Sequence, residues 1–242
     1  MSAGATVVDL WTAQPPLLTR PDLVARYEQL LTGDEAKRRR AYVREVNRQE
    51  YLVTRALVRT VLSRYRPGAP QDWRFTPNAY GRPLLTPPCG LHFNLSNSVD
   101  LVVCAVAEDV EIGVDIEPIA RADDVLEVAD TVFAARELEG LRALPTLEMR
   151  RARALDLWTL KESYIKARGM GLSLPLDRFS FVFDDPAEVR IVIDPALDDA
   201  GDRWTFRQLD VAGHRLALAV ERRVDAAALE VRLHAVTPLE SP

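Results

Sequence analysis

The stretch GVDIEP, residues 113–118, places two carboxylates two positions apart in a short apolar run. Alternate side chains of a strand point to opposite faces, so Val114 and Ile116 are expected in the core, while Asp115 and Glu117 emerge together. Two carboxylates on one face repel each other unless one binds a proton or both bind a divalent cation. The pattern therefore allows a metal site, and it equally allows an exposed acidic strand end.

A second group of candidate residues lies in the segment WTLKESYIKARGMG, residues 158–171. Helical spacing puts four side chains on one side: Trp158, Glu162, Ile165 and Lys166. The two apolar ones are expected to fasten the helix to the core, which makes this side unusual ground for a carboxylate. However, Glu at i and Lys at i+4 also form an ordinary helix ion pair worth roughly 0.2–0.5 kcal/mol. Spacing alone favours the ordinary ion pair.

Basic and small polar side chains upstream could contact an anion. Residues 37–66 carry ten Lys or Arg residues and two acids, a composition that a solvated, arginine-rich helix would also have. Arg82 lies in the rigid turn YGRPLL, residues 80–85. The motif FNLSNS, residues 93–98, is predicted to end in a polar loop, where hydroxyl, amide and backbone N–H groups suit phosphate oxygens, although most such loops bind nothing.

The elements that must position these groups occur in one order twice. Residues 36–66 have the apolar spacing of one or two long helices, and predicted strands follow at residues 73–76, 91–95, 101–107 and 112–117. Further helices are predicted at residues 125–132, 136–143 and 148–167, followed by strands at residues 179–183, 189–193, 204–209 and 216–220. Helices followed by a sheet, twice, predict an α+β fold of two similar halves.

The repeated order also predicts the domain organisation. We predict an N-terminal half at residues 1–112, a C-terminal half at residues 113–225 and a C-terminal tail at residues 226–242. A junction between two halves is a natural place for a ligand cleft.

Composition and charge are those of an ordinary globular protein, with 242 residues and a formal net charge of −5. The N-terminus lacks the cationic start and apolar core of a signal peptide, and the longest apolar run, residues 101–107, is too short to cross a bilayer. We therefore expect a cytoplasmic protein. The two cysteines and three histidines lack the spacing of a zinc site, so carboxylates, which favour a hard ion such as Mg²⁺, are the expected ligands for any metal.

The order of these motifs resembles that of a known family. RALVR (55–59), GRP (81–83), FNLSNS, GVDIE and WTLKESYIKARGMGLSLPL (158–176) are similar to the motifs of the 4′-phosphopantetheinyl transferases of the Sfp-like class, over residues 37–220. The two most specific blocks are GVDIE and WxxKESxIKxxGxGLSLPL, which have the family's separation. The resemblance implies two similar α+β halves related by a pseudo-two-fold axis, one active site in the cleft between them, and a monomer.

The resemblance implies a metal site and catalytic roles. Asp115, Glu117 and Glu162 would bind Mg²⁺, which holds the pyrophosphate of coenzyme A, and Lys166 would reach that pyrophosphate. Glu137, in FAARELEG, matches a glutamate proposed as general base in relatives, with a metal-bound water as the competing choice. The implied catalytic residues are thus Asp115, Glu137, Glu162 and Lys166.

Other residues are implied to contact coenzyme A directly: Arg55, Arg82, Ser96 and Asn97, with Lys37 and Arg48 as looser candidates. Asn97 departs from the family's usual FNxSHS loop, in which histidine stands at this position. Asparagine can donate through its amide, but it carries no positive charge and shuttles no proton. We expect weaker or altered cofactor binding without loss of activity.

The implied reaction transfers 4′-phosphopantetheine from coenzyme A to a serine of an acyl or peptidyl carrier protein, in fatty-acid, polyketide or non-ribosomal peptide synthesis. Such transfers depend on positioning and on neutralisation of oxygen charge. One alternative is a Mg²⁺-dependent nucleotide hydrolase, which needs no protein acceptor. Another is a module that binds nucleic acid or an anionic ligand through residues 37–66, which the acidic net charge and the lack of interleaved aromatic residues disfavour.

Overall fold

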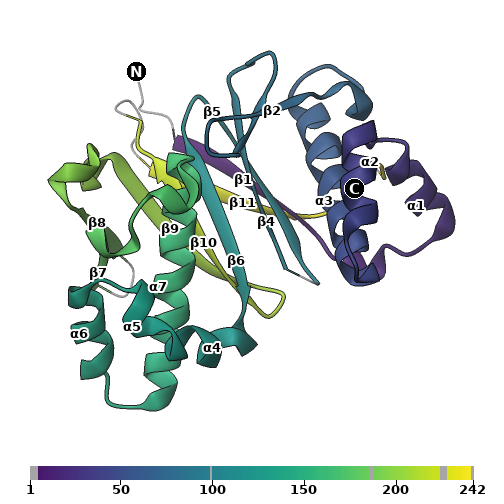
Figure 1. The fold of residues 1–242 in the computed structure, drawn as a ribbon. Coiled ribbons are helices and arrows are strands. Elements are labelled where there is room, and N and C mark those ends of the chain that lie inside the picture. The colour runs from purple at the N-terminus through teal and green to yellow at the C-terminus, as the bar shows by residue number, and fades with distance from the viewer. Residues whose placement is uncertain (1–4, 99, 186–187, 224–227, 241–242) are drawn as a thin grey trace. The chain divides into compact units, whose positions relative to one another are not determined.

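The chain, as a computed structural model, forms an N-terminal unit and a C-terminal unit, each built from three segments of the sequence (Figure 1). The described residues are 5–98, 100–185, 188–223 and 228–240. The N-terminal unit comprises residues 7–76, 83–109 and 230–242. The C-terminal unit comprises residues 1–6, 77–82 and 110–229. Both units combine helices with sheets, which confirms the predicted α+β class.

The N-terminal unit contains three helices and most of a four-stranded sheet. Its helices are α1 (Pro21–Glu28), α2 (Gly33–Ala41) and α3 (Glu45–Tyr65). The sheet has the order β11-β1-β5-β4, with β1 (Ala5–Ala13), β4 (Leu91–Asn97), β5 (Val102–Glu108) and β11 (Ala228–Ala235). A small two-stranded sheet pairs β2 (Phe75–Pro77) with β3 (Pro83–Leu85).

The core of the N-terminal unit lies between α3 and the sheet. The apolar side of α3 is fully buried, as the spacing of residues 36–66 predicts, and includes Leu52, Ala56, Leu57 and Val61. This segment forms two helices, since α2 ends at Ala41 and a separate helix, α3, starts at Glu45. The start of α2 is fixed by a capping box, in which Thr32 and Glu35 exchange hydrogen bonds between side chain and backbone.

The C-terminal unit packs helices against a three-stranded sheet. The sheet has the order β6-β10-β9, with β6 (Ile112–Pro118), β9 (Trp204–Val211) and β10 (His214–Glu221), and β7 (Phe179–Asp185) pairs with β8 (Glu188–Ile193). The helices are α4 (Ala122–Glu127), α5 (Ala129–Val132), α6 (Ala135–Ala143) and α7 (Leu147–Arg168). Long α7 lies along β6 and β10, as Figure 1 shows.

Short 3₁₀ helices connect the larger elements. They are η1 (Pro15–Leu17), η2 (Pro70–Asp72), η3 (Ile119–Arg121), η4 (Gly171–Ser173), η5 (Leu176–Arg178), η6 (Pro195–Leu197) and η7 (Gly201–Arg203). None of the helices in the described part of the chain is long and apolar enough to cross a membrane.

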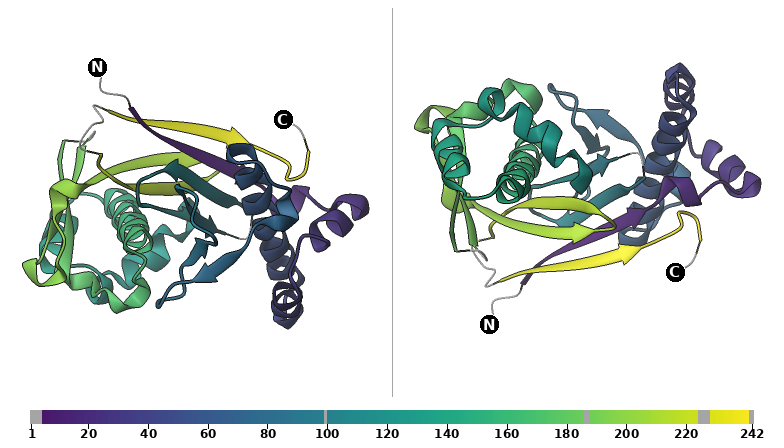
Figure 2. Two further views of the ribbon diagram at one scale, coloured as in Figure 1. Left: turned by 90° about the horizontal axis from the view of Figure 1, so that it is seen from above. Right: turned by 90° about the horizontal axis from the view of Figure 1, so that it is seen from below.

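Two strands at the ends of the chain were not expected from the sequence. Both views in Figure 2 show β1 and β11 side by side, and they are neighbours in the four-stranded sheet. The predicted C-terminal tail, residues 226–242, therefore contributes a strand to a sheet instead of ending as a separate peripheral segment. The predicted boundary between residues 225 and 226 lies outside the described residues, and the pseudo-two-fold relation of two halves stays a prediction.

Candidate active site

The two carboxylates of GVDIEP lie on β6 as the strand alternation predicts. Asp115 is buried, with 5% of its surface exposed, and its Oδ1 lies 2.6 Å from Lys166 Nζ on α7. Glu117 accepts a hydrogen bond at Oε1 from the Trp158 indole, over 3.2 Å, and at Oε2 from Arg121, over 2.8 Å. Both carboxylates therefore meet side chains of the same helix, α7.

The third predicted carboxylate, Glu162, lies on α7 one helical turn from both Trp158 and Lys166. It is half-buried, and within the described part of the chain its carboxylate has neither a hydrogen bond nor an ion pair. Burial raises the pKa of Glu162 and the nearby charge of Asp115 raises it further, while Lys166 lowers it. Burial and Asp115 likewise raise the pKa of Glu117. The three carboxylates thus repel one another, which favours a bound cation.

The donor set fits Mg²⁺ in kind, because carboxylate oxygens are its usual protein ligands. The side chains are not gathered around one point, however: no group of three His, Cys, Asp or Glu side chains in the described residues is arranged to hold a metal ion. The strand carboxylates have other partners here: Asp115 contacts Lys166, and Glu117 accepts hydrogen bonds from Trp158 and Arg121. The three-carboxylate metal site stays a prediction.

The close packing of α7 on β6 depends on Gly113, the first residue of GVDIE. A Cβ atom added there would lie 2.0 Å from Ser163 O and 2.3 Å from Ala167 N, both backbone atoms of α7. Only glycine therefore allows the observed approach of the helix to the strand. The sequence interpretation missed this role, although an isolated glycine inside a predicted strand is itself a signal of close backbone approach.

The end of α7 is held by a loop that contains Arg82. Arg82 Nη1 donates to Ala167 O over 2.8 Å and lies 2.7 Å from Glu111 Oε2, and its side chain is 11% exposed. Asn78 donates from Nδ2 to Gly169 O over 2.8 Å and accepts from the backbone N–H of Arg82 over 2.9 Å. These donors satisfy carbonyls that a helix end leaves without partners. Arg82, predicted to contact coenzyme A, is thus committed to the helix end in this structure.

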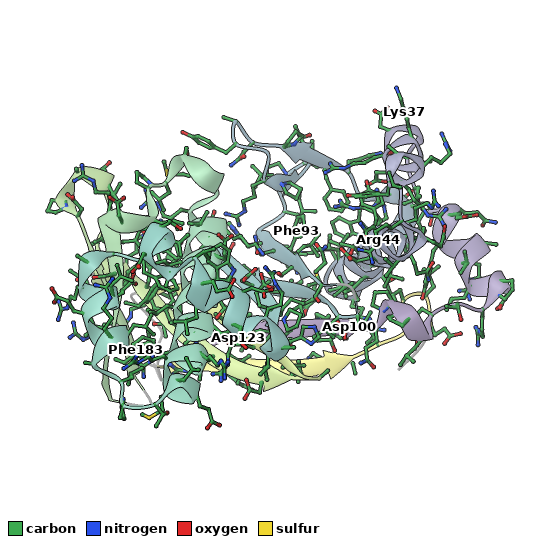
Figure 3. The ribbon with its side chains drawn as sticks, turned by 60° about the horizontal axis from the view of Figure 1, so that its bottom comes forward. Lys37, Arg44, Phe93, Asp100, Asp123 and Phe183 are labelled. Atoms are coloured by element: carbon green, nitrogen blue, oxygen red, sulfur yellow. The ribbon has the colours of Figure 1, made fainter. Side chains whose placement is uncertain are left out.

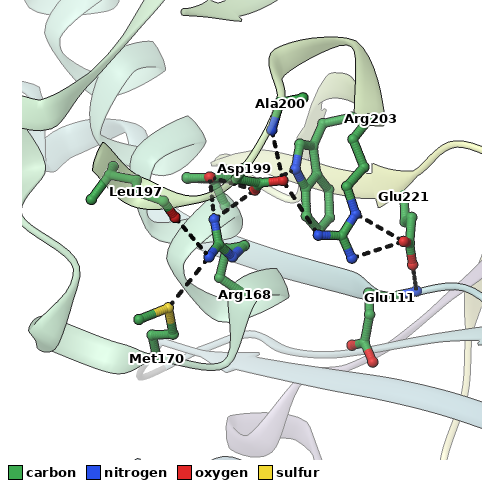
Figure 4. Close-up of polar contacts among 10 residues, drawn as sticks. Glu111, Arg168, Met170, Leu197, Asp199, Ala200, Arg203 and Glu221 are labelled. Atoms are coloured by element: carbon green, nitrogen blue, oxygen red, sulfur yellow. Dashed lines mark hydrogen bonds and ion pairs between the residues drawn. The ribbon is translucent and has the colours of Figure 1, made fainter. Parts of the chain in front are cut away.

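A second group of contacts, made by residues that follow α7 in the sequence, holds the same end of the helix (Figure 4). Asp199 Oδ2 accepts hydrogen bonds from Arg168 over 2.6 Å, from the Tyr164 hydroxyl over 2.7 Å and from the Trp204 indole over 2.9 Å. Its Oδ1 accepts from Ala200 N over 2.9 Å. The last turn of α7, which carries Lys166, is therefore anchored by side chains from two other parts of the sequence, the Asn78–Arg82 loop and Asp199.

Glu137, predicted as a general base, is part of a buried ion pair. Its Oε2 lies 2.8 Å from Lys161 Nζ, and neither side chain has any exposed surface. Glu137 also accepts hydrogen bonds from the backbone N–H groups of Ala134 and Phe181, and Lys161 donates to Leu176 O and Phe179 O. Burial raises the pKa of Glu137 and lowers that of Lys161. These contacts oppose the base role, because a base must reach the proton of its substrate.

The remaining predicted cofactor contacts belong to the N-terminal unit. Arg55 lies over the Tyr51 ring, 5.1 Å from its centroid, with Nη1 3.9 Å from Glu35 Oε1. Ser96 and Asn97 were predicted to lie in a loop, and this is wrong: both belong to β4, where Asn97 pairs with Val102 of β5.

The remaining candidate residues differ in whether their side chains already bind other protein groups. The amide of Asn97 donates to Glu50 of α3, whose pKa is raised by burial and lowered by this hydrogen bond. The looser candidate Arg48 binds Glu45 and the Tyr42 carbonyl, whereas Lys37 is exposed and points away from α2 (Figure 3).

Comparisons with known proteins identify the family. The model of the 4′-phosphopantetheinyl transferase superfamily matches residues 111–220. The chain is 34% identical over 166 residues to 4′-phosphopantetheinyl transferase Sfp of Bacillus subtilis, which covers 69% of this chain and 72% of Sfp. The chain belongs to this superfamily. It is also 34% identical over 146 residues to 4′-phosphopantetheinyl transferase HetI of Nostoc, which covers 59% of this chain and 61% of HetI.

Among solved structures, holo-[acyl-carrier-protein] synthase of Neisseria meningitidis matches 47% of this superfamily member and 98% of its own chain, with 19% identity and a TM-score of 0.39. The superfamily model covers β6 and α7, and hence Asp115, Glu117, Glu162 and Lys166. Arg55, Arg82, Ser96 and Asn97 lie outside the residues that it matches.

Proposed function

We propose that this member of the superfamily transfers 4′-phosphopantetheine from coenzyme A to a serine hydroxyl of an apo acyl or peptidyl carrier protein. One observation supports the proposal: β6 and α7 are joined by two contacts, Asp115 with Lys166 and Glu117 with Trp158, and Glu162 lies on α7 between the two helix residues. In the reaction, the serine oxygen forms a bond to the β-phosphorus of coenzyme A, the bond to the bridging oxygen breaks, and 3′,5′-ADP leaves. The serine proton passes to a water molecule, which we propose as the base because Glu137 is paired with Lys161.

The acidic residues are proposed to hold Mg²⁺ through Asp115, Glu117 and Glu162. Bound there, the ion would neutralise charge on phosphate oxygens. Among the described residues the Glu162 carboxylate has no hydrogen bond or ion pair, and this and the mutual repulsion of the three acids support the assignment. Their burial strengthens each charge interaction, because water screens it less than at an exposed site.

Lys166 is proposed to bind the pyrophosphate of coenzyme A. Its ammonium lies 2.6 Å from Asp115, with 26% of the side chain exposed, so it is partly accessible to a ligand. A pyrophosphate is negatively charged like the carboxylate that Lys166 contacts here, and lysine binds phosphate oxygens as a compact point charge. The anchored last turn of α7 holds the lysine backbone in place while its side chain changes partner.

We assign Arg55, Ser96 and Asn97 of the N-terminal unit to coenzyme A as proposed contacts. Arg55 is the best supported of them, because its closest carboxylate oxygen is 3.9 Å away, beyond hydrogen-bonding distance. Arg82 is a weaker candidate, since its guanidinium binds the end of α7 and Glu111. A monomer in the cytoplasm is the predicted form in which the enzyme acts.

Intact-mass measurement of an apo carrier protein after incubation with the protein, coenzyme A and Mg²⁺ tests the proposal. We expect the mass increment of phosphopantetheine, its loss with a chelator, and its return with added Mg²⁺. Glu162→Gln should abolish the increment, whereas Glu148→Gln, at an exposed position of the same helix, should retain it. Absence of the increment on several unrelated carriers would refute the function, and release of 3′,5′-ADP without a carrier would indicate a hydrolase.

A further inference from the structure

Two contacts between β6 and α7 lie on either side of Glu162. Lys166 binds Asp115, and Trp158 binds Glu117. On α7 these two residues are four positions after and four positions before Glu162, about 6 Å away along the helix in each direction. Glu162 is thus placed between the two strand carboxylates by a pair of contacts, of which one is ionic and the other is a hydrogen bond from an indole.

The contacts of Glu117 differ in their surroundings. Its carboxylate side chain is 16% exposed and accepts from Arg121 at one oxygen and from Trp158 at the other. Arg121 is half exposed, so its ion pair is screened by water and holds the carboxylate loosely. Trp158 is partly buried and packs on the apolar core of the C-terminal unit, which leaves its ring little freedom. The indole is therefore the rigid one of the two donors.

We infer that Trp158 is a positioning residue, whose indole N–H orients the Glu117 carboxylate toward Asp115 and Glu162. An indole only donates, so it binds one lone pair of Glu117 Oε1 and leaves the second lone pair of that oxygen for a cation. Hydrogen bonds of this kind fix the direction of a ligand group and typically change metal affinity 10- to 100-fold when removed. The inference rests on the proposed Mg²⁺ site and assigns a function to the tryptophan of the WTLKES motif beyond anchoring the helix.

Trp158→Phe tests this role because phenylalanine keeps an aromatic ring in the core but lacks the N–H group. The measurement is a Mn²⁺ titration of the protein without coenzyme A or carrier, followed by the electron paramagnetic resonance of free Mn²⁺, which takes oxygen ligands as Mg²⁺ does. We expect about tenfold or greater weakening of Mn²⁺ binding in the variant. Affinity within twofold of wild type would overturn the inference.

Trp204→Phe is the matched control. The Trp204 indole donates to Asp199 over 2.9 Å in the same unit, and Asp199 is not one of the proposed metal ligands. Trp204 is 2% exposed, so its replacement should lower the melting temperature by leaving a cavity, yet leave Mn²⁺ affinity unchanged. A loss of Mn²⁺ affinity equal to that of Trp158→Phe would show that the metal responds to general loosening, and would contradict the positioning role.

Testing Trp158→Phe in a Glu117→Ala variant separates the role of the indole from a general effect on folding. In Glu117→Ala, the carboxylate that Trp158 is inferred to orient is gone, so adding Trp158→Phe should weaken Mn²⁺ binding no further. An equal loss in both backgrounds would overturn the inference. If the wild-type protein binds no Mn²⁺, the inference also fails, but the carrier assay on the wild-type protein still reports separately whether phosphopantetheine is transferred.

Discussion

Gly113→Ala is predicted to destabilise the C-terminal unit because the new methyl group would meet backbone, which has little freedom to move. Its position, 2.0 Å from Ser163 O, is about 1.4 Å short of the distance at which ordinary contact begins. The second close atom, Ala167 N, belongs to the next turn of α7, so the helix would have to shift as a body. Added volume in a packed interior costs about 1–3 kcal/mol, and we expect the upper end here.

The assay is thermal and urea unfolding of purified protein. A loss of about 3 kcal/mol corresponds to a melting temperature lower by roughly 6–12 °C for a domain of this size. Gly140→Ala is the matched control, because Gly140 lies in α6 and a Cβ there meets no atom within 4 Å. This control should be neutral or stabilising by up to about 1 kcal/mol, since alanine favours helix over glycine.

The same substitution is expected to reduce transfer activity in the molecules that remain folded. A shifted α7 would carry Lys166 away from Asp115, whose contact at 2.6 Å is the shortest link between the helix and the strand carboxylates. Gly113→Ala with a stability within 0.5 kcal/mol of wild type would refute the reasoning, because it would show that α7 and β6 separate without cost.

Three further outcomes follow from the observed contacts. Lys161→Met should cost about 3–5 kcal/mol in urea unfolding, because it leaves the Glu137 carboxylate buried without its cation, and adding Glu137→Gln should restore part of this loss; additive losses would contradict the pairing. Asn78→Asp removes the donor to the carbonyl after α7 and should cost about 1–3 kcal/mol in thermal unfolding; an unchanged melting temperature would exclude a capping role. Asn97→His places a titratable ring beside Glu50. At pH values below about 6.5 the ring is positively charged and should attract the phosphates of coenzyme A, so the KM for coenzyme A should decrease in that pH range. A KM and a pH profile equal to those of the wild type would contradict this.

The elements that carry the candidate site could be predicted from local sequence patterns. Alternation in GVDIEP indicates one shared face for Asp115 and Glu117, and both carboxylates contact α7 in the structure. Helical spacing likewise predicts one side for Trp158, Glu162 and Lys166. These patterns are local because a strand or helix repeats within a few residues, and burial of one face imposes that repeat on the sequence.

What the sequence could not indicate depends on partners far along the chain. β1 and β11 are neighbours in one sheet although more than two hundred residues separate them. The segment ALEVRLHA of β11 alternates apolar and polar residues, a strand signal that the sequence interpretation missed, but its pairing with β1 has no local signal. Asn97 was assigned to a loop, yet β4 extends through it because the backbone finds a partner at Val102. Glu137 was given a catalytic role by resemblance to the family, and its buried partner Lys161 on another helix has no local signal in the sequence.

The two kinds of contact on α7 together determine where Glu162 points. Lys161 and Glu162 are adjacent, so their side chains leave the helix about 100° apart. The buried pair of Lys161 with Glu137 fixes the rotation of the helix about its axis, and the approach at Gly113 fixes its distance from β6. Given both, Glu162 is directed to the strand carboxylates, although its own carboxylate has no hydrogen bond or ion pair with any described residue. Breaking the buried pair should therefore lower transfer activity even though neither side chain has any exposed surface in this structure.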